Sequence, residues 1–322
     1  MKKNSFIIRS LCIAALCINP VMAQTYPTKP INIVVPFAAG GGADIPARII
    51  AKKLSESLGQ AVVVENRPGA TGTIGSNYVA KAKPDGYTLL VSTPSSHTMA
   101  PHTIKQLPYD PLGDLKPITL FASVRHLLVV NPEVPANTVK ELIDLAKAKP
   151  GALNYSSSGN GSSVHLATEM FNRMADISMK QIPYGGVTPA AVAVVGGQVD
   201  LNVIPAALAL PHIQTGALRP LVVLTPNRFS ALPNVPTIAE VGLNDYKAEM
   251  WLGLLAPANT PDHIVQTLQA EIARIVGMED VKETLGAMSI DVIATSTKEF
   301  DERIKTEYSE YGALIKELGL NQ

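Results

Sequence analysis

The chain alternates short apolar runs with stretches whose apolar residues recur at helical spacing. The run from Ile31 to Val35 is rich in β-branched residues, which is typical of a strand buried on both faces of a parallel sheet, and Pro36 ends it. After a glycine-rich loop, Ala47 and Leu54 mark the apolar face of a helix. Strands and helices that alternate in this way predict the α/β class.

The same two patterns recur to the end of the chain. Further strands are predicted at 61–65, 87–92, 153–156, 179–183, 199–204, 218–224 and 290–293. Further helices are predicted at 74–82, 138–149, 190–195, 206–214, 262–276, 279–288 and 297–318. The predicted helix caps are Thr71 or Thr73, Thr188, and a capping box from Thr138 to Glu141.

The length of the chain, 322 residues, favours two lobes over a single core. The apolar stretch 118–130 is interrupted around Ser123 to His126, and we interpret it as the strand that crosses into the second lobe. The stretch 250–256 is interpreted as the return. We therefore expect lobe one to comprise 24–124 and 248–322, and lobe two to comprise 125–247.

A strand, a loop of small residues and a helix N-terminus follow one another around Phe37 to Asp44. Consecutive glycines allow positive φ and bare backbone N–H groups, which suits an anion such as a carboxylate. The alternative is a tight turn that needs glycine for backbone reasons alone. The candidate ligand-binding residues of this first loop are Phe37, Ala39, Gly40, Gly41, Gly42 and Asp44.

Asp44 has two interpretations that the sequence leaves open. It is placed to cap the helix or to pair with Arg48 four residues later. A functional Asp44 would instead orient a bound water or an amine, since its charge repels a carboxylate.

The segment from Ser157 to His165 repeats the same design in the second lobe. Its serines are either donors to ligand oxygens or helix caps, and His165 is either a ligand neighbour or a residue that braces the loop. Two such loops from different lobes could close on one ligand. The candidate residues of this second loop are Ser158, Gly159, Gly161, Ser162, Ser163 and His165.

A third hydroxyl-rich loop, 93–97, is predicted at the carboxyl end of a strand, where open α/β sheets bind ligands. Thr93 and Ser95 are its candidate residues, and we expect it to share a crevice with the first loop. Phe37 and Tyr184 are the aromatic side chains nearest the two main loops, and each either walls the ligand or packs under its loop.

Other chemistries are disfavoured by residue spacing. Ser162 and His165 stand three residues apart, but the G-x-S-x-G elbow of a serine hydrolase is absent. The six histidines show no metal-ligand spacing, so neither a metal nor a cofactor is predicted. The nearest guanidinium groups, those of Arg67 and Arg125, are not placed well enough to predict a contact with an acid. Backbone N–H groups, hydroxyls, helix dipoles and ordered waters must then hold it.

The N-terminal segment predicts export. Lys2, Lys3 and Arg9 precede an apolar run, and small residues end at Ala23, so we expect a signal peptide over 1–23 and a periplasmic protein. A membrane anchor is the alternative, but the apolar run is well short of the ~20 residues that a membrane span needs.

The composition narrows the possible partners. Both cysteines lie in the predicted signal, so the mature chain depends on no disulfide. Cleavage removes three of the 27 basic residues and none of the 27 acidic ones. A mildly acidic chain without a basic cluster argues against nucleic acid or an anionic membrane as the partner. We expect a soluble monomer.

Five segments carry a family resemblance: Tyr26-Pro27-x-Lys29-Pro30-Ile31, Val35-Pro36-Phe37-Ala38-Ala39-Gly40-Gly41-Gly42-x-Asp44, Val64-Glu65-Asn66-Arg67-Pro68-Gly69-Ala70, Lys83-Pro84-Asp85-Gly86-Tyr87-Thr88-Leu89-Leu90 and Gly196-Gly197-Gln198-Val199-Asp200. They closely resemble the Bug-type family, the substrate-binding proteins of tripartite tricarboxylate transporters. The match extends over essentially the whole mature chain.

The resemblance implies a two-lobed periplasmic binding protein of the type II, Venus-flytrap kind, which passes small carboxylates to a membrane permease. In the family, the loops matching 37–44 and 157–163 pinch the ligand carboxylate, partly through ordered waters. Family ligands include citrate, dicarboxylates, acidic amino acids and aromatic acids. The segment 202–206 is less polar here than the resemblance leads us to expect, so Pro205 is a candidate ligand neighbour that favours a less polar ligand.

We therefore predict a solute-binding protein that is not an enzyme. Closure of the lobes over a carboxylate would create the form that a permease recognises. Two other functions stay open: a secreted hydrolase using Ser162 and His165, and a sensory module that hands its closed form to a receptor.

Overall fold

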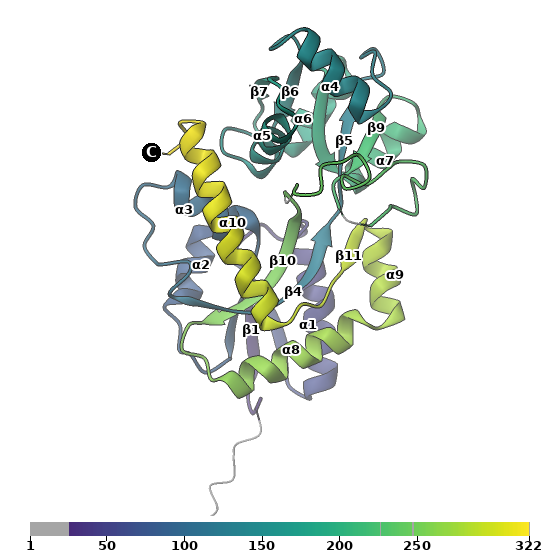
Figure 1. The fold of residues 1–322 in the computed structure, drawn as a ribbon. Helices are drawn as coiled ribbons and strands as arrows, with labels where there is room; N and C mark the ends of the chain where they lie inside the picture. Colours follow the sequence, from purple (N-terminus) through teal and green to yellow (C-terminus); the bar gives the residue numbers. More distant parts are fainter. Residues whose placement is uncertain (1–25, 226, 247, 322) are drawn as a thin grey trace, which may run out of the picture.

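The computed structural model describes residues 26–225, 227–246 and 248–321, which form two sheets in two halves of the molecule (Figure 1). The predicted signal peptide, 1–23, lies outside the described residues. The strands are β1 (Ile31–Val35), β2 (Val62–Asn66), β3 (Thr88–Ser92), β4 (Leu115–Val124), β5 (His126–Val130), β6 (Asn154–Ser157), β7 (Lys180–Pro183), β8 (Leu201–Pro205), β9 (Arg219–Val223), β10 (Met250–Pro257) and β11 (Ile290–Val292).

Helices surround both sheets. They are α1 (Asp44–Leu58), α2 (Thr73–Ala80), α3 (Ala100–Thr103), α4 (Val139–Ala148), α5 (Ser163–Ala175), α6 (Val187–Val195), α7 (Ala206–Gln214), α8 (Asp262–Val276), α9 (Glu279–Ala287) and α10 (Thr297–Glu317). Two short helical turns, η1 (Ala70–Gly72) and η2 (Ser95–Met99), precede α2 and α3. No helix of the described ranges combines the length and the apolar character that a membrane crossing requires.

The first sheet has the strand order β11-β4-β10-β3-β1-β2 and is mixed, with β1 parallel to β2 and β3 and with β10 antiparallel to β3 and β4. Ile31 and Ile33 face α1 and α8, whereas Val34 packs with Val79 of α2 on the other face. This burial on both sides explains the continuous apolar run of β1 and confirms its prediction.

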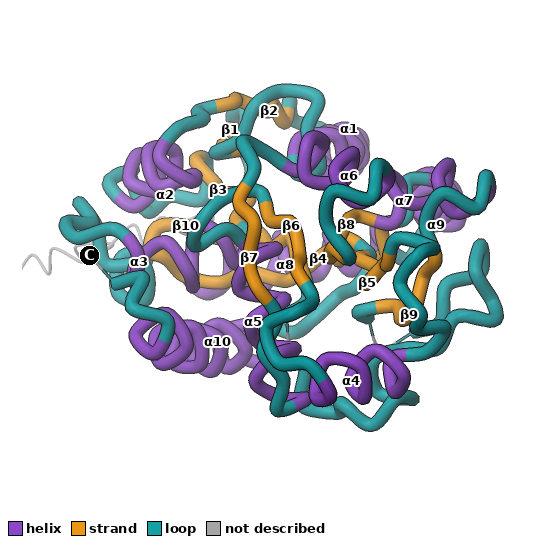
Figure 2. The backbone as a smooth tube through the Cα atoms, turned by 90° about the horizontal axis from the view of Figure 1, so that it is seen from above, coloured by secondary structure: helices purple, strands orange, loops and turns teal. Residues whose placement is uncertain are grey.

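The second sheet has the order β7-β6-β8-β5-β9. Seen from above (Figure 2), helices lie on both sides of its strands. Val130 and Leu201 pack with Phe171 of α5 on one face, and Val129 packs with Val194 of α6 on the other. The α/β class predicted from the sequence is confirmed.

One residue, Arg125, separates β4 of the first sheet from β5 of the second. Its backbone N–H donates to the carbonyl of Ser289 at 3.1 Å, and its own carbonyl accepts from Ala206 at 2.8 Å. Its guanidinium is ion-paired with Asp291 and lies over the Phe229 ring, 4.3 Å from the centroid. The predicted interruption of the crossing strand is therefore confirmed, and Arg125 fastens the two halves together at that point.

The C-terminal helix α10 extends from the first sheet to α5 of the second half (Figure 1). Tyr311 and Leu314 of α10 share an apolar cluster with Leu166 of α5, and Arg173 pairs with Glu317 at 3.2 Å. The sequence assigned this helix to lobe one alone. The division of the chain into two lobes stays our proposal, with α10 as an additional contact between them.

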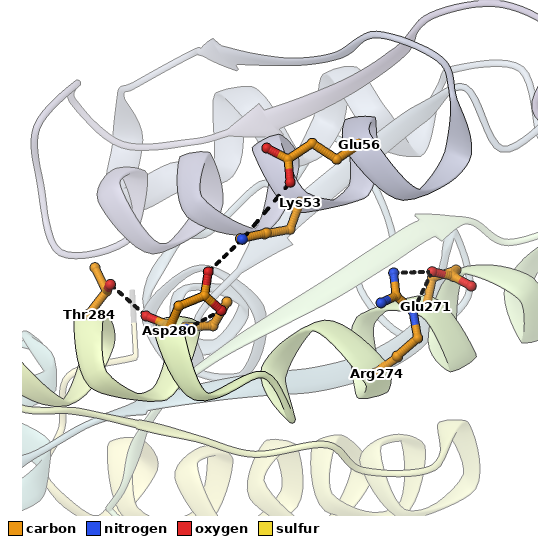
Figure 3. Close-up of polar contacts among 7 residues, drawn as sticks. Lys53, Glu56, Glu271, Arg274, Asp280 and Thr284 are labelled. Atoms are coloured by element: carbon orange, nitrogen blue, oxygen red, sulfur yellow. Dashed lines mark hydrogen bonds and ion pairs between the residues drawn. The ribbon is translucent and has the colours of Figure 1, made fainter.

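Helix α1 begins directly after the glycine loop. At its other end, away from that loop, it is held by α8 and α9. Figure 3 shows Lys53 of α1 between Glu56 of the same helix and Asp280 of α9, and a pair of Arg274 with Glu271 within α8. These pairs are partly or fully exposed and contribute little. Buried Leu54 and its neighbours in the same cluster position the helix instead.

Three cap predictions have different outcomes. Thr138 caps α4, accepting from Glu141 N at 3.1 Å, but the Glu141 carboxylate accepts from Asn137 N and not from Thr138 N. The predictions for α2 and α6 are wrong. Their N-caps are Gly72 and Gly186, neither with a side-chain cap.

Candidate ligand-binding site

The first loop, 37–43, connects β1 to α1. Fewer of its glycines have positive φ than the sequence allows. Gly40 has φ of +77°, whereas Gly41 and Gly42 lie outside the left-handed region. Of the three glycines that allow positive φ, only Gly40 adopts it. A Cβ added to Gly42 would meet no atom within 4 Å, so open space surrounds that position.

Asp44 is 1% exposed and holds this loop together. Its Oδ2 accepts from the Gly40 amide at 2.8 Å and from Arg48 Nε at 2.9 Å, and its Oδ1 accepts from Asn66 Nδ2 at 2.8 Å. Asn66 also donates to the carbonyl of Phe37 at 3.1 Å. Burial would raise the pKa of Asp44, but the hydrogen bonds from Arg48, Gly40 and Asn66 outweigh it and lower that pKa.

These bonds show which of the two structural partners Asp44 has, whereas a role in orienting a bound water or an amine stays a prediction. The ion pair with Arg48 is present, while the N-cap position belongs to Ala43. The amides of Gly40 and Gly41 are occupied, by Asp44 and by the carbonyl of Ala38. Ala38, Ala39 and Gly42 are exposed, and no described residue accepts from their amides. Those amides are donors that the loop offers.

Gly72 joins the loops that follow β1, β2 and β3. With φ of +91°, it lies so close to its neighbours that an added Cβ would be 2.9 Å from Ser96 Cβ and 3.3 Å from the Phe37 ring. The first loop and the segment after β3 therefore meet at Gly72, and that they share a ligand crevice stays a prediction. The sequence did not single out Gly72.

The segment after β3 differs from its prediction. Residues 95–99 form a π-helical turn where we expected a loop, and Pro94 before them already has helical φ and ψ of −51° and −41°. Thr93 is 8% exposed, and its amide donates to Ser96 Oγ at 3.3 Å. Ser95 is half-buried.

The second loop is braced in the same manner as the first. The Gly161 amide donates to Nδ1 of His165 at 3.0 Å, so Nδ1 is an acceptor and the neutral ring carries its proton on Nε2. Burial lowers the pKa of His165, against a smaller opposite effect from Glu169. His165 thus braces the loop, and a contact of its ring with the ligand stays a prediction.

Some serines of this loop brace it, whereas others have hydroxyls without a protein partner among the described residues. Ser162 is the N-cap of α5, accepting from His165 N at 3.3 Å. Ser157 Oγ accepts from Gly159 N at 3.3 Å and from Gln181 Nε2 at 2.7 Å. Ser158 and Ser163 are half-buried, and no protein contact of their hydroxyls is found among the described residues.

A nucleophile and base pair does not form here. The Ser162 hydroxyl contacts the backbone of His165, and Nδ1 of the ring faces the Gly161 amide. A catalytic serine needs its hydroxyl against a ring nitrogen. The geometry therefore favours structural roles for both residues.

Tyr184 and Pro205 border the second loop. Tyr184 is half-buried, donates its amide to the Ser157 carbonyl at 2.9 Å, and lies beside Gly159. Pro205 ends β8 opposite His126, next to the crossing between the two sheets. The second loop also approaches the first half, since a Cβ added to Gly161 would lie 3.5 Å from Thr103 Cγ2 of α3. Sequence analysis missed Thr103, because nothing in its pattern marks it.

Each of the three guanidinium groups near the loops has a carboxylate partner. Arg48 faces Asp44, Arg67 pairs with Glu65, and Arg125 pairs with Asp291. Two cavities lie elsewhere: one of about 410 Å³ beside α10, and one of about 710 Å³ beside α2. Among the described residues, no group of three histidine, cysteine, aspartate or glutamate side chains is arranged to hold a metal ion.

Comparison with known proteins decides the family. Residues 46–320 match the family model described as the tripartite tricarboxylate transporter family receptor. The chain belongs to this receptor family. The receptor is 36% identical to Protein BugT of Bordetella pertussis over 301 residues, which cover 93% of this chain and 92% of that protein. The resemblance drawn from the five sequence segments is thereby confirmed.

Solved structures establish the fold of the receptor as that of a periplasmic binding protein. A structure described as a periplasmic transporter is 36% identical, with a TM-score of 0.75, and the match covers 92% of this chain and 99% of that one. An R. palustris protein solved with adipate is 34% identical, with a TM-score of 0.75 and coverage of 91% and 98%. MatC from Rhodopseudomonas palustris, solved with bound malate, is 30% identical, with a TM-score of 0.71 and coverage of 90% and 100%.

Proposed function

We propose that this receptor captures a small carboxylate between its two braced loops and delivers it to a tripartite tricarboxylate transporter permease. It acts in the periplasm, after removal of 1–23, by binding and release and without catalysis. The ligand class comprises dicarboxylates, tricarboxylates, acidic amino acids and aromatic acids. Two relatives, solved with adipate and with malate, support the carboxylate assignment.

The observation that carries the proposal is the shared architecture of the two loops. In each, a side chain in the first turn of a helix accepts from a glycine amide four residues earlier: Asp44 from Gly40, and His165 from Gly161. The brace fixes the loop, so that the remaining N–H groups and the helix N-terminus stay directed outward. Such groups bind anions without a cationic side chain.

The ligand would also set the conformation. A carboxylate that contacts both loops has a higher affinity for the arrangement in which they approach each other, and so raises the population of that arrangement. Arg125 lies where one chain segment crosses between the sheets, so a change in lobe orientation would take place around it. The permease would then recognise the ligand-loaded form.

The test is a thermal-shift screen with mono-, di- and tricarboxylates, aromatic acids, sugars and nucleotides. A ligand at 100 times its Kd adds about 2.7 kcal/mol to the native state, which raises the Tm of a chain of this size by roughly 2 °C or more per kcal/mol. We expect shifts with carboxylates alone. Shifts confined to sugars or nucleotides would refute the assignment.

A matched pair of variants ties the ligand to the first loop. Gly42 has no atom within 4 Å of an added Cβ and does not have left-handed φ, so Gly42→Leu should fold while filling the space beside the exposed amides. Gly286 of α9 has the same freedom outside the loops and provides the control, Gly286→Leu. We expect the carboxylate shift to disappear in the first variant and to remain in the second.

A further inference from the structure

The cavity of about 710 Å³ beside α2 is lined by an unusual concentration of cations. Lys29, Arg67, Lys81 and Lys83 line it, and Asp85 is the one carboxylate among its lining residues. The protein as a whole has equal numbers of basic and acidic residues, so this groove stands out against its surroundings. We call it the α2 groove.

The cations of the α2 groove are only partly neutralised. Lys29 pairs with Asp85 at 3.1 Å, and Arg67 pairs with Glu65 at 2.6 Å. Lys81 and Lys83 are exposed, and within the part of the chain that the structure describes neither has a carboxylate partner. The groove therefore keeps a net positive charge.

Aromatic rings hold the paired cations in place. Arg67 lies over the Tyr78 ring at 3.6 Å, and Lys29 lies over the Tyr87 ring at 4.2 Å. The Nε of Arg67 is buried without a hydrogen-bond partner among the described residues. These side chains form a rigid floor for a bound group, since a cation that stacks on a ring gives up less freedom on binding.

The same side of the molecule exposes apolar side chains. Ile74 and Tyr78 of α2 are 54% and 40% exposed and follow each other at helical i, i+4 spacing. Val63 of the edge strand β2 is 55% exposed. Because Val62 and Val64 face the core beneath α1, Val63 points to the α2 side of the sheet. Three of the five large apolar side chains that are exposed in the described ranges thus gather here.

We propose that the α2 groove is a docking surface for an acidic polypeptide segment that also carries apolar side chains. Carboxylates of the segment would neutralise Lys81 and Lys83, and its apolar residues would cover Ile74 and Tyr78. Charge complementarity of this kind sets the specificity and the association rate of a protein interface. None of the residues that line the α2 groove belongs to the braced loops, so we expect its partner to bind without competing for the carboxylate site.

The test uses a defined probe: a fluorescein-labelled peptide of alternating glutamate and serine with two central leucines. Fluorescence anisotropy at low ionic strength measures its binding to the mature receptor. The groove variant is Lys81→Glu/Lys83→Glu. The control is Lys147→Glu/Lys149→Glu, which makes the same charge change at the same spacing on exposed residues at the end of α4.

We expect the groove variant to bind the peptide about ten-fold more weakly or worse, and the control variant to bind like the wild type. Added salt should weaken wild-type binding, because it screens exposed charges. Equal loss in both variants, or no binding to the wild type, would overturn the proposal. So would groove-dependent sedimentation with phosphatidylglycerol vesicles in place of peptide binding, since the occupant would then be a membrane surface.

A second readout keeps this proposal distinct from the proposed function. The carboxylate-induced thermal shift should be the same in the wild type and in Lys81→Glu/Lys83→Glu. The Tyr78→Ser variant tests the apolar half of the groove without changing any charge. Weaker peptide binding with an unchanged salt dependence is expected from it, and wild-type affinity would contradict the apolar contribution.

Discussion

Nδ1 of His165 accepts a hydrogen bond from the Gly161 amide at 3.0 Å, and Oδ2 of Asp44 accepts one from the Gly40 amide at 2.8 Å. Both bonds span four residues, and both connect a loop glycine to the first turn of the following helix. An imidazole and a carboxylate thus fill the same structural role in the two halves. The ligand-binding proposal depends on this pair of braces.

Removing the second brace should weaken ligand binding. The variant His165→Phe keeps a ring but lacks the acceptor, so the Gly161 amide loses its partner and we expect a stability loss of about 1 kcal/mol. Carboxylate affinity should fall well beyond that of His165→Asn, which retains an acceptor oxygen. Isothermal titration calorimetry, at a temperature where both variants are folded, measures the difference. Wild-type affinity in His165→Phe would show that the brace is dispensable.

The first brace should make the protein sensitive to acid. The pKa of Asp44 is lowered from its ordinary value of 3.8, so its stabilisation is complete above that value and is lost as the pH falls through the folded-state pKa. The variant Asp44→Asn should lower the free energy of unfolding at pH 7 by about 1–3 kcal/mol and show less further loss in acid. Urea unfolding between pH 7 and pH 3 provides the comparison. Parallel pH curves for both proteins would contradict the assignment.

Glu307 should give the free energy of unfolding the opposite dependence on pH. It is 2% exposed, and burial raises its pKa to about 7 in spite of Arg303 and the Trp251 indole N–H. The folded state then binds this proton more tightly than the unfolded chain does, so the free energy of unfolding should fall as the pH rises from about 4.5 to about 7. Glu307→Gln should remove this decline. Urea unfolding of wild type and variant, followed by Trp251 fluorescence, gives the two free energies of unfolding at each pH. Their difference isolates the contribution of Glu307 from that of other titrating groups.

Gly72 should tolerate substitution poorly for two separable reasons. Gly72→Ala forces left-handed backbone on alanine, and its Cβ would lie 2.9 Å from Ser96 Cβ. Gly151 has φ of +72° with no atom within 4 Å of an added Cβ, so Gly151→Ala isolates the free-energy cost of a left-handed backbone at alanine. We expect about 1–2 kcal/mol of destabilisation at Gly151 and about 1–3 kcal/mol more at Gly72. Chemical denaturation of both variants measures this, and equal losses would argue against close packing of the three loops.

The regular elements were predictable because their signals are local. The bounds of α7 and α8 agree with the predicted ranges 206–214 and 262–276, and the apolar run of β1 predicts burial on both faces. The break at Arg125 was visible as an interruption of an apolar stretch. In each case the residues that form the element also carry the pattern that predicts it.

The loops were predicted less well because their bonds join residues across the fold. Thr71, Thr73 and Thr188 are suitable caps by residue type, but glycines take the N-cap positions. The pairing of Asn66 with Asp44 and the contact of Gly72 with Phe37 depend on how β1 and β2 lie side by side. Spacing along the chain identified the two loops as candidates, whereas the identity of their free amides came from the structure.

The most direct test of the central claim is an NMR titration of the ¹⁵N-labelled mature receptor with a carboxylate identified by thermal shift. The account predicts that the amides of Ala39 and Gly42 shift together with those of Ser158 and Ser163, all with one Kd, while those of Gly151 and Gly286 stay unchanged. Shifts confined to one of the two loops, or different dissociation constants for the two, would contradict a carboxylate held jointly by both halves.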